Sequence, residues 1–178
     1  LPAVLLTVLV SAPVPGGQPD RRAVGERLMA DPAVAVALAR VKRDEPRVIE
    51  DQVALCEVPA PPFGEAARAA RFRDALERLG MKGARIDGAG NVIARRPGAA
   101  PRPHLVFSAH LDTVFPPETP VATSRAGAVL RGPGITDDCR GLAVLLGVVR
   151  TMEAMRLQTP GSVTFVGTVG EEGLGDLR

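Results

Sequence analysis

The N-terminal third of the chain alternates apolar and charged residues at helical spacing. Residues 20–57 show this pattern throughout, which predicts two helices. Asp31 is typical of an N-cap, and Pro32, the next residue, suits the first helical position. A second helix start is expected near Pro46, and the proline-rich stretch that follows residue 57 ends the helical pattern.

Two further segments predict helices with one buried side. Residues 65–80 form a charged amphipathic stretch that ends on Gly80, a favoured residue just beyond a helix C-terminus. Residues 138–155 carry leucines and valines at i, i+3, i+4 and i+7, with extra apolar residues that widen the stripe. We therefore expect this last helix to lie against a sheet.

Between the helices lie apolar runs of strand length. Residues 84–94 are typical of two short strands about a glycine turn, and residues 128–131 of another short strand. Residues 104–109 and 161–173 are continuous rather than alternating in hydrophobicity, so both faces of these strands are expected to be buried. The order of elements favours an α/β sandwich with a parallel or mixed central sheet.

Composition limits the classes of function. The 178 residues suffice for one domain with a real core. The net charge is only +2, the 22 basic residues are spread along the chain, and aromatic residues make up 3%, so nucleic acid is not an expected partner. The two cysteines, Cys56 and Cys139, are too few for a disulfide framework, although a single pair stays open.

The first residues form a unit of their own. Residues 1–19 are an apolar run followed by small residues and prolines, shorter than the roughly 20 residues that span a bilayer. They resemble the core and cleavage region of a secretory signal, or else form a disordered N-terminus. Export to the periplasm or medium is expected in the first case and a cytoplasmic location in the second. Residues 20–178 show no compositional break and are expected to form one domain.

Acidic residues and a histidine stand where three apolar segments end. Binding sites in open α/β sheets form at the carboxyl ends of strands, so neighbouring strands bring such groups to one place. Four or five carboxylates in one crevice repel one another, and a divalent cation is the simplest neutraliser. One imidazole with carboxylates suits zinc, and manganese or cobalt are compatible. The groups are His110 and Asp112, Asp137 and Asp138, and Glu171 and Glu172.

Each ending has an ordinary explanation when it is taken alone. A histidine at a strand end is usually structural or solvated, and adjacent glutamates in a loop usually face water. Asp137 and Asp138 could simply cap the helix that follows them. A structural α/β domain with coincidental acids is therefore one reading of the chain, but it needs three separate coincidences.

Rival motifs are absent or incomplete. Gly132 and Gly134 begin a dinucleotide-type pattern, but Asp137 stands where its third glycine belongs. No phosphate-binding GxxxxGK is present. Ser108 lacks a nucleophile elbow, and Cys139 follows two acids that raise a thiol pKa instead of lowering it.

Three motifs in order resemble a family of zinc exopeptidases and deacylases. They are SAHLDTV, GPGITDDCRG and GEEGLGD, with 27 residues from His110 to Asp137 and 34 from Asp137 to Glu171. The family includes peptidase T, carboxypeptidase G, aminoacylase and succinyl-diaminopimelate desuccinylase, and the peptidase T-like branch is the most similar. The resemblance implies a three-layer α/β sandwich with a mixed, mostly parallel central sheet, and hydrolysis of a peptide or an N-acyl amino acid.

The resemblance also implies a role for each residue. His110 binds one of two zinc ions, Glu172 binds the other, and Asp137 bridges them through a carboxylate whose peptide bond to Asp138 is often cis in the family. Two such cations about 3.5–4 Å apart lower the pKa of a shared water towards about 7.

The two remaining acids take part in catalysis in the family. Glu171 is the general base that receives the proton of the water, and Asp112 orients the zinc-binding histidine through its second ring nitrogen. Adjacent glutamates suit this division, since one binds metal and the other moves protons.

The chain departs from the family pattern in ways that matter. Cys139 and Arg140 occupy positions where the family usually has lysine and a small residue. The family takes two more ligands from later sequence and inserts a smaller domain there that often mediates dimerisation. We therefore expect the chain to be the N-terminal part of a longer enzyme, a homodimer when whole, and inactive as 178 residues alone. A non-catalytic binding module on the same scaffold is the alternative function.

Overall fold

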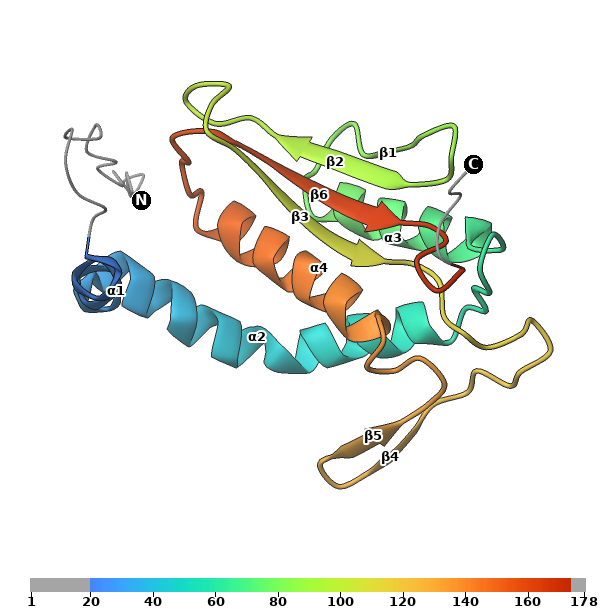
Figure 1. Ribbon diagram of the computed structural model, residues 1–178. Helices are drawn as coiled ribbons and strands as arrows, with labels where there is room; N and C mark the ends of the chain where they lie inside the picture. Colours follow the sequence, from blue (N-terminus) through green and yellow to red (C-terminus); the bar gives the residue numbers. More distant parts are fainter. Residues whose placement is uncertain (1–19, 174–178) are drawn as a thin grey trace.

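The computed structural model describes residues 20–173, so the expected signal segment at residues 1–19 lies outside the described residues. Four helices and six strands make up this part, in an order that mixes the two (Figure 1). The helices are α1 (Arg21–Ala30), α2 (Pro32–Cys56), α3 (Ala66–Arg78) and α4 (Cys139–Ala154). The strands are β1 (Arg85–Ile86), β2 (Val92–Arg96), β3 (His104–His110), β4 (Ser124–Ala126), β5 (Val129–Arg131) and β6 (Ser162–Thr168).

The N-terminal helices are divided at a different place from the one predicted. Asp31 does cap α2, since its carboxylate accepts the backbone N–H of Ala33 at 2.7 Å, and Pro32 is the first helical residue. The predicted second start near Pro46 is wrong, because α2 runs through that proline without interruption. The helix tolerates Pro46 because this exposed proline removes only one backbone N–H donor. Packing of α2 against α4 stabilises the turns that follow it.

The other two helices lie close to the predicted bounds. Gly80 follows α3 with a φ of +100°, a conformation in which a residue with a Cβ is strained. Helix α4 buries the predicted apolar stripe against the sheet. The core joins α3, α4 and one sheet face, and its fully covered side chains include Phe72, Leu76, Val92, Leu142, Leu146 and Phe165.

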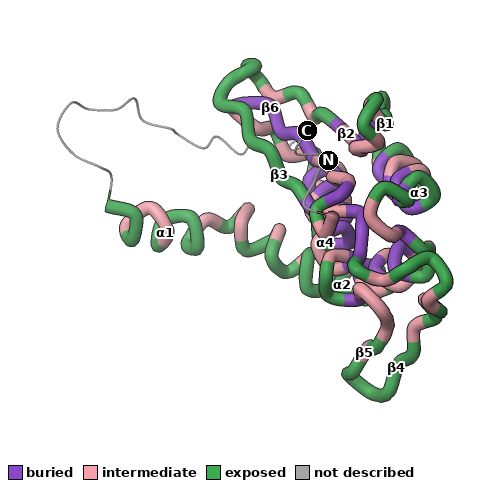
Figure 2. Tube along the Cα trace, turned by 45° about the vertical axis from the view of Figure 1, so that its right-hand side comes forward, coloured by how far each residue is buried: buried purple, intermediate pink, exposed green. Residues whose placement is uncertain are grey.

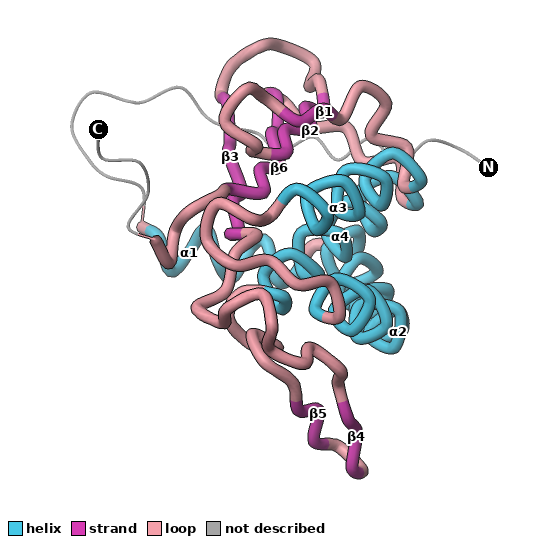
Figure 3. Tube along the Cα trace, turned by 90° about the vertical axis from the view of Figure 1, so that its right-hand side faces the viewer, coloured by secondary structure: helices cyan, strands magenta, loops and turns pink. Residues whose placement is uncertain are grey.

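The main sheet has the strand order β1-β2-β6-β3. Strand β6 is central, antiparallel to β2 and parallel to β3, which confirms the α/β class and the mixed sheet. Two of the three strand pairings described in this sheet are antiparallel, so its described part is not mostly parallel. Helices α3 and α4 cover one face of the sheet and α2 packs on α4, so the second helical layer of the expected sandwich is not among residues 20–173 (Figures 1 and 3).

Strand β3 corrects one expectation. Its apolar run predicted burial on both faces, but residues 104–108 are exposed, because β3 forms an edge of the described sheet and α4 covers it only partly. An apolar run shows that a strand can be buried; it does not show which segment covers it. Strand β6, by contrast, is buried along most of its length, as predicted (Figure 2).

Two outlying parts complete the described chain. Strands β4 and β5 pair as a separate hairpin between β3 and α4, and β4 was not predicted. Helix α1 has no buried residue and projects from the body (Figure 2). No helix within residues 20–173 combines the length and apolarity that crossing a membrane requires.

Candidate metal centre

Parallel pairing of β3 and β6 brings their carboxyl ends to one edge of the sheet. His110 is the last residue of β3, Glu172 lies four residues beyond the end of β6, and Asp137 lies just before α4. Their register fixes the alignment, since His110 pairs with Thr168 at the strand ends. The strand-end argument made from sequence therefore describes how these side chains come to be neighbours.

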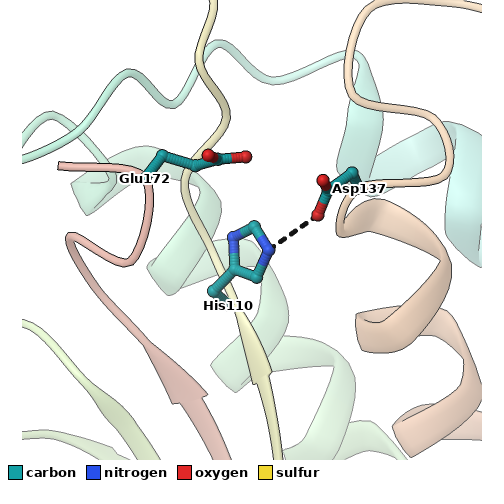
Figure 4. Close-up of side chains that lie close together, drawn as sticks. All are labelled: His110, Asp137 and Glu172. Carbon is teal, nitrogen blue, oxygen red and sulfur yellow. Dashed lines mark hydrogen bonds and ion pairs between the residues drawn. The ribbon is translucent and has the colours of Figure 1, made fainter. Parts of the chain in front are cut away.

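The three side chains point toward a common space (Figure 4). The Nε2 atom of His110 lies 2.9 Å from Oδ1 of Asp137. One potential ligand atom from each of His110, Asp137 and Glu172 lies within 4.8 Å of the others. The histidine is mostly covered, with a side chain 12% exposed, whereas the Asp137 side chain is 74% exposed and faces solvent. A cation could thus reach the cluster from solvent.

The hydrogen bonds of His110 leave one nitrogen for a metal. Its Nδ1 lies 3.0 Å from the backbone carbonyl of Asp112, and a carbonyl only accepts, so Nδ1 carries a proton. Nε2 is then the nitrogen left for a metal, and it faces the carboxylate of Asp137 (Figure 4). This arrangement, with the far nitrogen donating to a carbonyl, is the common one for metal-binding histidines.

Asp112 contacts the glutamate loop more closely than it contacts the histidine. This fully buried carboxylate accepts the backbone N–H groups of Glu171 and Glu172 at 3.1 and 2.8 Å. It lies 3.5 Å from Nδ1 of His110. The histidine is oriented by the Asp112 backbone, and the Asp112 side chain holds the segment that carries the two glutamates.

Glu171 lies beside the three potential ligands, and its side chain is exposed. Its Oε2 is 4.0 Å from Nε2 of His110, and its side chain is 62% exposed. No hydrogen bond of the described residues involves the Glu171 carboxylate. A carboxylate near the cluster but not fixed by the protein is suited to receiving and releasing a proton.

The two adjacent aspartates divide their tasks. Asp138 caps α4 by accepting the N–H of Gly141 at 2.8 Å, and its other oxygen accepts the N–H of His110 at 3.1 Å. The capping interpretation therefore describes Asp138, while Asp137 faces the histidine. The peptide bond between them is cis, as the family resemblance implied.

The pKa values of the cluster reflect its excess of negative charge. Burial by itself lowers the pKa of His110, but the hydrogen bond to Asp137 and the surrounding carboxylates outweigh it and raise the pKa. Loss of hydration raises the pKa of Glu172, and repulsion from Asp137 adds to the effect. Both shifts describe carboxylates crowded around a single imidazole, a charge distribution that a divalent cation would relieve.

Two buried side chains behind the site were not found from sequence. Arg68, 1% exposed, donates to the carbonyls of Leu111 and Val58 at 2.7 and 2.6 Å and so holds the turn between His110 and Asp112. Glu65 accepts the N–H of Gly170 at 2.9 Å. Both lie where α3 begins, and nothing in an amphipathic charge pattern separates them from surface residues.

The cysteines lie behind the site as buried free thiols. The proximity of the two thiols and then burial raise the pKa of Cys139 far above its ordinary value, while the same proximity lowers the pKa of Cys56. A buried thiol of raised pKa is a poor nucleophile, which agrees with the exclusion of Cys139 from catalysis.

Comparison with known proteins supports this picture. The model of peptidase family M28 matches residues 91–175, which include all of the candidate site residues. Among curated proteins, N-formyl-4-amino-5-aminomethyl-2-methylpyrimidine deformylase of Halalkalibacterium halodurans is 30% identical over 126 residues, covering 64% of this chain and 30% of the deformylase.

Two solved structures share the fold. Aminopeptidase PepT of Bacillus cereus is 25% identical, with a TM-score of 0.61 over 71% of this chain and 36% of its own. A dinuclear metal-binding peptidase of Bacillus subtilis is 22% identical, with a TM-score of 0.53 over 74% of this chain and 36% of its own. The chain spans about a third of the length of these relatives.

Proposed function

We propose that this chain, which matches the model of peptidase family M28 over residues 91–175, carries the metal-binding part of a site that hydrolyses peptide or N-acyl amide bonds. The observation that carries the proposal is the approach of His110, Asp137 and Glu172, whose potential ligand atoms lie within 4.8 Å of one another. These residues come from three separate segments, and each offers an atom that zinc accepts.

The proposed ligands divide between two cations. His110 would hold one, Glu172 would hold the other, and Asp137 would contribute to both. The Bacillus subtilis relative is a dinuclear metal-binding peptidase, which supports two cations over one. Zinc is the proposed metal, and the donor set also accepts manganese or cobalt. When bound, the cations activate water and polarise an amide carbonyl.

The chain's own groups supply proton transfer and positioning. Glu171 accepts a proton from the attacking water and returns it to the leaving amine, since its exposed carboxylate lies 4.0 Å from the histidine and has no fixed partner. Asp112 keeps Glu171 and Glu172 in place through their backbone N–H groups. The Asp112 carbonyl keeps Nδ1 of His110 protonated, so that Nε2 faces the metal.

The substrate class follows the relatives and stays broad. One relative is named a deformylase and another an aminopeptidase, so the proposal covers both formyl-type amides and peptides. The described residues give each cation one terminal ligand besides Asp137. Since stable zinc sites use three or four ligands, we propose that the 178 residues alone bind zinc weakly and do not turn over substrate.

A zinc titration tests the ligand assignment, and the two histidines make a matched pair. His104 begins the strand that His110 ends, and its Nε2 bonds to Thr164 at 2.8 Å. Isothermal titration with zinc should show binding to wild type and to His104→Ala. His110→Ala and Asp137→Ala should weaken zinc binding by at least about tenfold, because each removes a ligand. Equal affinity in all four proteins would remove the metal-site proposal.

A separate assay tests turnover. The wild-type chain, saturated with zinc, is incubated with an aminoacyl anilide and a formylated aromatic amine, and release of the amine is followed. No zinc-dependent release is expected from the 178 residues. Zinc-dependent release that Glu171→Gln abolishes would support the general base and contradict inactivity of the chain alone.

A further inference from the structure

Glu65 is a buried carboxylate whose two partners come from segments far apart in the sequence. The residue is 4% exposed and immediately precedes α3, yet its side chain makes no capping bond to that helix. Its Oε1 accepts the N–H of Phe63 at 2.8 Å and the N–H of Gly170 at 2.9 Å. One oxygen thus joins two segments separated by more than 100 residues.

The second partner belongs to the segment that carries the two glutamates of the site. This segment, residues 169–172, has no regular secondary structure, yet each of its four backbone N–H groups is received by a side-chain oxygen. Asn91 accepts from Val169 at 3.1 Å, Glu65 from Gly170, and Asp112 from Glu171 and Glu172. Side chains from three distant parts of the chain therefore define the path of this loop.

Phe63 covers the same loop from the solvent side. A Cβ built on Gly170 would lie 2.9 Å from the Phe63 ring, and Gly170 has a φ of +69°. The ring therefore lies against the loop backbone at a position that accepts no side chain. Since Glu65 also holds the N–H of Phe63, its carboxylate fixes both the loop and the aromatic ring on it.

The energetics favour a role for the carboxylate in holding the loop. Hydrogen bonds to an ionised acceptor are stronger than those between neutral groups, and a buried carboxylate without partners is costly. Glu65 has no salt bridge among the described residues, so its bonds to the two N–H groups are what offset its burial. Displacing Gly170 from Glu65 would leave the Gly170 N–H without this acceptor and the buried carboxylate with Phe63 alone.

We propose that Glu65 is a positioning residue for Glu171 and Glu172: it fixes the loop so that these carboxylates face His110, although it contacts neither of their side chains. The inference rests on the proposed function for its consequence, which is that zinc affinity depends on Glu65. The structural part of the inference, that Glu65 fixes the Gly170 backbone by a hydrogen bond, does not depend on that function.

Three substitutions at Glu65 separate position from charge. Glu65→Gln keeps an oxygen at the same reach, Glu65→Asp keeps the charge but withdraws it by one methylene, and Glu65→Ala removes both. Amide hydrogen exchange of Gly170, Glu171 and Glu172 is measured by NMR without metal, with the amides of β2 and β6 as an internal reference. Zinc affinity is measured by isothermal titration on the same proteins.

We expect exchange at Gly170 and its neighbours to be about tenfold faster in Glu65→Ala and Glu65→Asp, with the reference strands unchanged. Zinc affinity should fall by about 10-fold in both. Glu65→Gln should restore exchange and affinity to within about threefold of wild type, because its oxygen accepts the same two N–H groups. Glu65→Asp keeps the measurement decisive if the alanine variant does not fold.

Three results would overturn the inference. One is wild-type exchange at residues 170–172 in the aspartate variant, and another is equal acceleration in the loop and the reference strands, which indicates general destabilisation. The third is unchanged zinc affinity alongside faster loop exchange. Failure of wild type to bind zinc would defeat the proposed function, and loop exchange would then decide the role of Glu65 by itself.

Discussion

At the scale of single residues, His110 lies between a carbonyl and a carboxylate that favour its protonated form. Nδ1 faces the carbonyl of Asp112 and Nε2 faces Asp137, so an imidazolium can donate to both. These partners raise the pKa of His110 despite its burial. A metal ligand must be neutral, so metal and proton compete for the same nitrogen.

This competition predicts how zinc affinity changes with pH. As pH is lowered, zinc affinity should fall because protons occupy Nε2 of His110. Since the pKa of His110 is raised, this fall should begin while the pH is still above the ordinary histidine pKa of about 6.5. Below the raised pKa, zinc affinity should drop roughly tenfold for each pH unit. Isothermal titration between pH 5.5 and 8.5 measures the dependence. His110→Ala should bind weakly with a shallower dependence, and a pH-independent wild type would contradict the assignment.

The metal-free protein should respond to pH in the opposite sense. A histidine whose folded pKa is raised contributes stability below its unfolded pKa, and this contribution is lost as pH rises through the folded value. Urea unfolding in a chelator should therefore show stability declining from about pH 6.5 upward. The decline should be absent in His110→Ala, and saturating zinc should reverse its direction.

We expect substitution of Asp112 to lower both the stability of the protein and its affinity for zinc. Its carboxylate accepts two N–H groups in a fully buried position, and Asp112→Asn replaces one acceptor oxygen by an NH₂ that opposes an N–H. We expect the free energy of unfolding to fall by about 1–3 kcal/mol and zinc affinity by about 10–100-fold. Asp31→Asn, a matched change at a distant helix cap, should alter neither quantity.

The residues of the site differ in how visible they are in the sequence. His110, Asp137 and Glu172 stand out together, because three apolar segments each end in such groups. Glu65, Arg68 and Asn91 do not, since each acts through backbone groups of segments far away in sequence. A helical charge pattern cannot tell a buried carboxylate that holds a loop from one that faces water.

At the scale of elements, α2 is a helix that keeps a proline in its interior. Pro46 is exposed and lies between a projecting N-terminal half and a C-terminal half packed on α4. The sequence predicted a break there because proline lacks an N–H and crowds the preceding turn. Packing of the later turns against α4 keeps the helix continuous, and this packing cannot be read from the local sequence pattern.

We expect substitutions of the two prolines of α2, Pro32 and Pro46, to change the free energy of unfolding differently. Pro46→Ala restores an N–H within α2 and should raise the free energy of unfolding by about 1–3 kcal/mol, with a rise in helical circular dichroism. Pro32→Ala, at the first helical position where no N–H bond is missing, should be neutral or slightly destabilising. Urea unfolding of both variants measures the difference, and equal effects would mean that α2 is not continuous through Pro46.

At the scale of the whole molecule, helices cover the described part of the sheet on one face only. The core residues of β6, Val163 and Phe165, face α3 and α4, and Phe107 of β3 stacks on Phe165 with ring centroids 5.8 Å apart. Alternation places Val106 on the opposite face, where it is 58% exposed. The α/β class could be predicted from sequence, but the exposure of β3 could not, because an apolar run does not show which segment packs on it.

This open edge predicts self-association of the 178-residue chain. Strand β3 is apolar, and within residues 20–173 only its β6 side is paired, so its other side offers free N–H and C=O groups to a second strand. Sedimentation of the metal-free chain should show a mean mass that rises with concentration. Val106→Lys should weaken this association about tenfold, because a charge on an edge strand opposes pairing. Val129→Lys, a similarly exposed valine on the separate β4–β5 hairpin, should leave it unchanged, and equal behaviour of the two lysine variants would place the contact elsewhere.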